Sequence, residues 1–286
     1  MQEGKRESFD QVALRVSTDD GQTWGEPETV VVSGLDLERY QRPMDPTLLQ
    51  LSDGRFRLYF ASSEKSQPSE FRGQPRGGQH SGNLGRRSAG PGIYSAISSD
   101  LKKFTLEEGK RSDRDEPGVV DPTAVLHGSS YYMVAHPESH GMRSGPRSPF
   151  ELRQGYFATS ADGYRFERQM NLAAPSDGDF IGNLFSHLGR LFFFGGSFKG
   201  IWSISSQDGK EWGRVSVSQL KGGDPSVFTD SSGKLQVLFV GEVRSDAIGQ
   251  PEWMKRLNRG HITGPRFDLE KGQSPMRDPR NSEQRR

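Results

Sequence analysis

The chain has no cysteine, which excludes disulfides, thiolate nucleophiles and cysteine-based zinc sites but leaves its redox compartment open. Hydrophobic residues make up only 31% of 286 residues, and no apolar run is long enough to span a bilayer. The formal net charge is +1, so no overall field attracts nucleic acid or an anionic membrane surface. We therefore predict neither nucleic-acid binding nor membrane insertion.

Glycine and proline are abundant instead, with 35 and 17 residues, a composition that favours short strands and tight turns over long helices. One eight-residue element occurs four times, always with Asp at its fourth position and an aromatic residue at its eighth. The four copies are residues 17–24, 97–104, 159–166 and 205–212, and a weaker echo lies at 262–267. We expect Ser and Asp to cap the turn amides and Gly to supply the positive φ. This repeat is predicted to be structural.

A second element opens a strand in each repeat unit, and its shared feature is an Asp that is usually followed by Pro. Its four aspartates are Asp45, Asp121, Asp179 and Asp224. Each is followed by a turn and then by an aromatic or aliphatic strand. The two elements alternate along the chain, which predicts an all-β fold, a β-propeller of four-stranded antiparallel blades.

We predict a single propeller domain over residues 1–272 and a disordered, polar tail over 273–286. The predicted blades cover residues 41–112, 117–173, 177–220 and 222–272, after an N-terminal half blade at 9–33. Five blades are expected, with the two missing strands supplied from upstream of Met1 or by the C-terminal segment. The alternative is four blades, with the half blade completing the last one.

Because strands alternate in direction, the Asp-Pro starts and the loops between second and third strands share one face, around the mouth of the central tunnel. The ring of aspartates at this mouth has three interpretations. The carboxylates cap their own entry turns, or they catalyse glycoside hydrolysis, or they hold a cation such as Ca²⁺ on the axis. No other cofactor is predicted, and the pattern His136, Glu138, His140 lacks a typical zinc spacing.

The Asp-Pro start followed by the pattern of residues 53–60 resembles the five-bladed glycoside hydrolases of the arabinanase and β-xylosidase type. The first turn element, residues 17–24, resembles the Asp box of the sialidase superfamily. The resemblance implies that Asp45 is the general base and that Asp121 orients and tunes the acid. The third catalytic position in this family is a Glu at the start of the next blade, where this chain has Asp179. The acid would then be Asp179 or a substitute such as Glu242.

The predicted function is therefore hydrolysis of an oligo- or polysaccharide in the axial pocket. The residues expected to bind the carbohydrate are Tyr40, Arg42, His136, Glu138, Asp224 and Trp253, the last as a stacking platform. A non-catalytic carbohydrate-binding or interaction propeller is one alternative. A sialidase-like exo-hydrolase with an Arg cluster and a Tyr nucleophile is the other.

The sequence gives no prediction of oligomeric state. The first ten residues are polar where a signal peptide needs an apolar core. We nevertheless expect a secreted or periplasmic protein whose signal peptide lies outside this chain, with a cytoplasmic location as the alternative.

Overall fold

The structure is a computed structural model that describes residues 12–65, 90–112, 118–137, 154–175, 178–242 and 257–261. Within these ranges it is built from strands, turns and loops, and it contains no helix that could cross a membrane. The all-β prediction is therefore confirmed. The expected tail at 273–286 lies outside the described residues.

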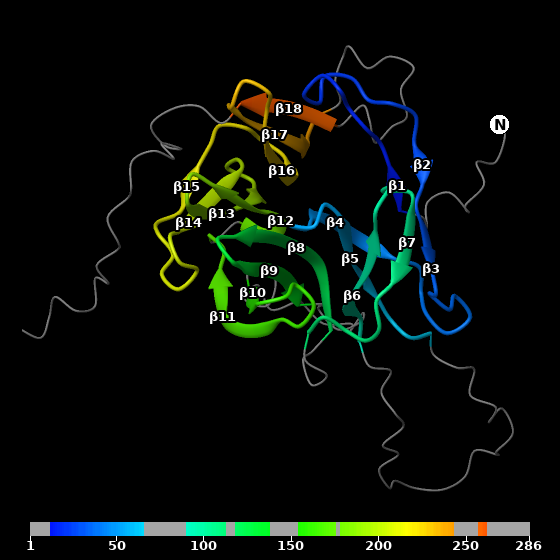
Figure 1. The fold of residues 1–286 in the computed structure, drawn as a ribbon. Helices are drawn as coiled ribbons and strands as arrows, with labels where there is room; N and C mark the ends of the chain where they lie inside the picture. Colours follow the sequence, from blue (N-terminus) through cyan, green and yellow to red (C-terminus); the bar gives the residue numbers. More distant parts are fainter. Residues whose placement is uncertain are drawn as a thin grey trace, which may run out of the picture.

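Four larger sheets fan out around a common centre, as Figure 1 shows, and each runs outward from one inner strand. The first contains β4 (Met44–Gln50), β5 (Phe56–Ser62), β6 (Gly92–Ser98) and β7 (Lys103–Leu106), and β3 (Val31–Ser33) is added at its outer edge. The second contains β8 (Val119–His127), β9 (Ser130–Pro137), β10 (Gln154–Ser160) and β11 (Glu167–Ala173).

The third sheet contains β12 (Gly178–His187), β13 (Arg190–Ser197), β14 (Trp202–Ser206) and β15 (Ser216–Val217). The fourth contains β16 (Gly223–Thr229), β17 (Leu235–Val240) and β18 (Leu257–His261). Within each sheet, consecutive strands pair antiparallel, and the inner strands β4, β8, β12 and β16 contact one another in that order. Contact of this kind does not extend from β16 to β4 in the described residues, so the four sheets do not form a closed ring.

The N-terminal region forms a two-stranded hairpin, and the strand that follows it joins the first sheet. A short hairpin joins β1 (Ala13–Leu14) to β2 (Glu28–Thr29), and β3 then pairs in parallel with β7 of the neighbouring sheet. Apolar side chains of this region, including Val12, Val30 and Val32, cover the face of the first sheet that carries Phe60. The turn of the hairpin reaches the fourth sheet instead, where the Asp20 carboxylate accepts hydrogen bonds from the backbone N–H and hydroxyl of Ser231.

The hydrophobic core lies between the sheets, in separate clusters. One cluster joins Tyr59 and Ile93 of the first sheet to Met133 of the second, and another joins Phe157 of the second to Trp202 of the third. A third cluster lies between the third and fourth sheets. Because each sheet buries both faces against its neighbours, its central strands are apolar on both sides, which explains runs such as residues 191–194.

The four copies of the eight-residue element form turns, which we call the Ser/Asp turns. The first connects β1 to β2, and the other three connect the third and fourth strands of the first three sheets. In the second copy, the Asp100 carboxylate accepts hydrogen bonds from the backbone N–H groups of Lys102 and Lys103 and from the Ser98 hydroxyl. The fifth residue of every copy has a positive φ, from 65° to 78°, including Leu101 where the other copies have Gly. The side chains thus accept hydrogen bonds from turn N–H groups that have no backbone acceptor.

The Ser/Asp turns also hold neighbouring sheets together. The third copy packs against the sheet before it: Arg57 donates to the carbonyl of Asp162 at 3.0 Å, and the Tyr59 hydroxyl donates to the carbonyl of Gly163 at 2.7 Å. Arg57 is itself held by Glu107, with N–O distances of 2.7 and 2.9 Å. Gly163 is required at this contact, because a Cβ would lie 2.9 Å from the guanidinium and its φ is +68°.

Candidate functional site at the Asp-Pro mouth

Three inner strands open with the same local distortion. In β4 the two residues Asp45 and Pro46 face a single residue of β5, because the register shifts between Met44 and Thr47. Asp121 with Pro122 and Asp224 with Pro225 lie in equivalent shifts of β8 and β16. Each site is a β-bulge. Proline is tolerated there because its position donates no hydrogen bond to the neighbouring strand.

The aspartates at these bulges are held in a left-handed backbone conformation. The φ angles of Asp45, Asp121 and Asp224 are 51°, 50° and 48°. Non-glycine residues rarely adopt this region, and its cost is on the order of 1–3 kcal/mol per residue when the surrounding structure enforces it. Three equivalent strained carboxylates at one end of neighbouring strands identify this end as the candidate site.

Asp45 interacts with both of the other bulge aspartates. Its carboxylate accepts a hydrogen bond from the backbone N–H of Asp121, which belongs to the next sheet, and it experiences the negative charge of Asp224. Desolvation by the surrounding protein raises the pKa of Asp45 above the ordinary value, the Asp224 charge adds to this, and the Asp121 hydrogen bond opposes it. The side chain still reaches solvent at the open mouth. A carboxylate that merely capped its own turn would not bond to the next sheet.

The third aspartate does not occupy the equivalent register. In β12 the pairing shifts between Gly178 and Gly182, so that three residues, 179–181, face one residue of β13. The residue after Asp179 is Phe180 instead of Pro, and it is fully buried against Phe193 and Trp202, with ring centroids 4.9 and 5.3 Å away. The prediction that all four aspartates are equivalent is therefore wrong for Asp179, because an anchored aromatic replaces the proline of the bulge.

Polar side chains close to the mouth join the inner strands to one another. The Thr123 hydroxyl accepts a hydrogen bond from the backbone N–H of Leu184 at 2.9 Å, which links β8 to β12. The Asn183 side-chain oxygen accepts one from the backbone N–H of Val227 at 3.0 Å, which links β12 to β16. The sequence prediction missed both residues. For Thr123 a usable signal was present, because a Thr or Ser lies two positions after each bulge Asp; for Asn183 there was none.

Other predicted site residues have mixed outcomes. His136 was expected in a loop but lies in β9, where it is buried and pairs with Val120, the neighbour of Asp121. Strand β9 is longer than predicted because its apolar run continues into the bulge region.

Glu242 is exposed and follows Val240 by two residues. Because Val240 pairs with Gly223, beside Asp224, Glu242 lies at the mouth. Glu138 and Trp253 lie outside the described residues.

Tyr40 and its neighbours form a polar cluster beside the start of β4. The Tyr40 hydroxyl donates to the Glu64 carboxylate at 3.3 Å, and Arg39 forms a 2.7 Å salt bridge with the same carboxylate. Burial raises the pKa of Tyr40, which disfavours the phenolate that a Tyr nucleophile requires. Arg39 is already paired with Glu64, and Arg42 is exposed near this cluster. The cluster is thus better suited to fixing the entry of β4 than to sialidase chemistry.

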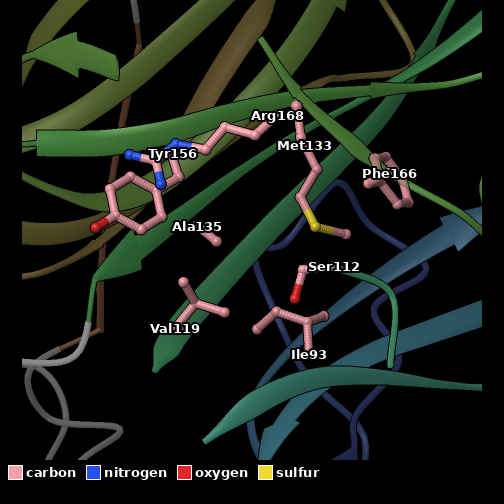
Figure 2. A pocket seen from close by; sticks show the side chains of 9 residues that line it. Ile93, Ser112, Val119, Met133, Ala135, Tyr156, Phe166 and Arg168 are labelled. Atoms are coloured by element: carbon pink, nitrogen blue, oxygen red, sulfur yellow. The ribbon is translucent and has the colours of Figure 1, made fainter. Parts of the chain in front are cut away.

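The described residues include no group of three or more His, Cys, Asp or Glu side chains arranged to hold a metal ion. A cavity of about 20 Å³ lies between the first two sheets, where Ile93, Met133, Tyr156 and Phe166 line it (Figure 2). This volume holds about one water molecule, so the cavity is a packing defect and not a sugar site. The bulge aspartates therefore remain the candidate site.

No protein-family model matches the sequence, and no curated protein matches it. Solved structures do match. A protein of unknown function from Dyadobacter fermentans is similar over 88% of this chain and 72% of its own, with a TM-score of 0.56 and 15% identity. A thermostable family-43 glycoside hydrolase is similar over 76% of this chain and 72% of its own, with a TM-score of 0.52 and 11% identity.

These likenesses concern the fold, because the identities are far below those that carry an activity from one protein to another. The chain has the β-propeller architecture that propeller glycoside hydrolases also have, and this confirms the broad fold class predicted from the two alternating repeats.

Proposed function

We propose that this protein is a glycoside hydrolase that cleaves an oligo- or polysaccharide at the Asp-Pro mouth. The observation that carries the proposal is the contact of Asp45 with its neighbours: its carboxylate is bonded to the Asp121 backbone across two sheets and is repelled by Asp224. Glycoside hydrolysis needs a pair of carboxylates close together, and the mouth brings Asp45 close enough to Asp224 for their charges to interact.

In this mechanism Asp45 is the general base. A raised pKa makes a carboxylate a stronger base as long as it remains ionised at the working pH. Asp121 positions Asp45 through its backbone N–H, and its own carboxylate tunes the acid. The acid is Asp179 or Glu242, and Glu242 is favoured by its longer side chain and by its place beside the start of β16.

The proposal is tested with aryl glycosides and with soluble polysaccharides such as xylan, arabinan and galactan, by release of aryl alcohol or of reducing ends. Asp45→Asn should lower turnover at least about hundredfold, and Asp121→Asn should also lower it. Asp53→Asn is the matched control, since Asp53 is exposed at the opposite end of β4 and pairs with Arg55. Turnover that survives both Asp45→Asn and Asp121→Asn would contradict the proposal.

The same substrates separate the two candidate acids. Loss of the acid should remove activity on polysaccharides but spare dinitrophenyl glycosides, whose leaving group needs no proton. We expect this pattern for Glu242→Gln and a smaller, uniform effect for Asp179→Asn. The reverse result would assign the acid to Asp179.

A non-catalytic carbohydrate-binding propeller is the second candidate. It is favoured by the altered register around Asp179, where three residues face one residue of β13 and the Asp-Pro bulge of the other inner strands is not repeated. Retention of the wild-type protein by a polysaccharide without any release of reducing ends would select this candidate over the hydrolase.

We also propose that the N-terminal hairpin occupies the position of a fifth blade, between the fourth sheet and the first. The Asp20–Ser231 contact on one side and the β3–β7 pairing on the other support this placement. A double-mutant cycle of Asp20→Ala and Ser231→Ala should show coupling in the melting temperature. Additive effects would contradict this placement.

A further inference from the structure

One aromatic side chain at the mouth has no packing role. Phe198 is 93% exposed, the most exposed of the large hydrophobic side chains among the described residues. Leaving an aromatic ring in water forgoes the burial that usually stabilises it. A single exposed apolar residue is ordinary on a protein surface, so its place and its rigidity must decide whether it is a site.

Phe198 lies on the same face as the bulge aspartates. It follows Ser197, the last residue of β13, and Ser197 pairs with Gly178 at the start of β12. Asp179 is the next residue of β12. The ring therefore projects from the rim of the mouth, one strand outward from an inner strand start. The predicted stacking residue, Trp253, lies outside the described residues.

The turn that carries Phe198 is fixed by hydrogen bonds. The Ser197 hydroxyl donates to the carbonyl of Gly200 at 2.7 Å and accepts from the backbone N–H of Lys199 at 3.2 Å. Gly200 has a φ of +144°, and a Cβ at this position would lie 2.1 Å from the Ser218 carbonyl oxygen. The backbone N–H of Ile201 donates to the carbonyl of Leu220 at 2.7 Å. The backbone that carries the ring is therefore preorganised, and binding does not have to order it.

We propose that Phe198 is a stacking platform for a pyranose or furanose ring of the substrate, next to the unit held by the bulge aspartates. The C–H face of a sugar is apolar and slightly positive, and it complements the negative face of an aromatic ring. A flat, exposed aromatic ring on a fixed turn at the edge of a carboxylate site is suited to an extended polysaccharide. This inference rests on the proposed function only for the identity of the ligand.

The test compares Phe198→Ala with Phe198→Trp, which keeps a stacking ring. Leu188→Ala is the matched control, because Leu188 is 66% exposed but lies at the opposite end of β12, beyond His187. Binding is measured by retardation in native gels cast with xylan, arabinan or galactan, and KM and kcat are measured on any polysaccharide that is cleaved. We expect Phe198→Ala to weaken retardation and raise KM about five- to tenfold with kcat little changed.

Phe198→Trp and Leu188→Ala should retain the wild-type behaviour. Equal retardation and KM for wild type and Phe198→Ala would overturn the platform while leaving the hydrolase intact. Retardation that depends on Phe198 without any turnover would support the platform and overturn the hydrolase. If none of these polysaccharides retards the wild-type protein and none is cleaved by it, both the platform and the hydrolase would be overturned.

Discussion

Aspartates at the two ends of the sheets have opposite proton affinities. In the Ser/Asp turns, hydrogen bonds from backbone N–H groups and hydroxyls lower the pKa of Asp19 and of Asp100 to about 2. At the Asp-Pro mouth, desolvation and a neighbouring negative charge raise the pKa of Asp45. The same type of side chain is thus a structural cap where donors surround it and, in the proposed mechanism, a base where donors are few.

This comparison predicts that the end with the Ser/Asp turns carries stability and the mouth carries chemistry. The Arg57–Glu107 pair is the strongest support of the turn end, because it is nearly buried and holds the Asp162 carbonyl of the next sheet. Glu107→Ala would leave the guanidinium without its carboxylate, and we expect a loss of about 3–5 kcal/mol in the free energy of unfolding. Chemical denaturation measures it.

Glu108→Ala is the control, since that side chain is exposed beside the pair. The double variant Arg57→Met/Glu107→Leu should recover part of the loss, because it removes both charges together. A Glu107→Ala protein as stable as the control would show that the turn end is not held by this ion pair.

The Ser/Asp turns should contribute next. Asp100→Ala removes the acceptor for two backbone N–H groups, and we expect its melting temperature at pH 7 to fall by several degrees. Hydrolytic activity per folded molecule should not change. Asp53→Ala, an exposed aspartate outside the four turns, should have a smaller effect. Equal losses in the two variants would contradict a specific role for the turn.

The pH dependence of stability has a defined sign. The pKa of Asp19 and of Asp100 is lower in the folded protein than the ordinary 3.8, so their stabilisation is present above about pH 4. It should be lost as the pH falls from 4 to 2, where the folded carboxylates become protonated. Melting temperatures over this range should fall steeply in the wild type and less steeply in Asp100→Asn. Parallel slopes would exclude Asp100 as a contributor.

The smallest effect concerns the coupling of two mouth carboxylates. The charge of Asp224 raises the pKa of Asp45, so Asp224→Asn should lower that pKa. Titration of the Asp45 side-chain carbon by NMR measures the shift. An unchanged Asp45 titration would show that the two carboxylates do not interact.

The repeat pattern was sufficient to predict the architecture because both of its elements are local. A capped turn such as 97–104 and a proline bulge such as Asp45-Pro46 are encoded within a few residues, and their alternation fixes the antiparallel sheets. The register of β12 was not predictable in this way, because the burial of Phe180 depends on Trp202 and Phe193. The parallel pairing of β3 with β7 joins segments some 70 residues apart, and no local pattern indicates it.

The candidate site was predictable only in part. Aspartate at a strand start was visible in the sequence, but the left-handed backbone and the contact from Asp45 to the next sheet depend on tertiary structure. Phe198 was missed because an aromatic residue beside an apolar strand is ordinarily assigned to the core.

A matched pair of variants tests the division between the two ends most directly: Asp45→Asn at the mouth and Asp100→Asn in a Ser/Asp turn. Turnover and melting temperature are measured for both at pH 7. We expect Asp45→Asn to abolish turnover and to raise the melting temperature by about 1–3 °C, because it removes a desolvated charge. Asp100→Asn should lower the melting temperature and keep turnover. Full turnover in Asp45→Asn, or loss of turnover in folded Asp100→Asn, would contradict the account.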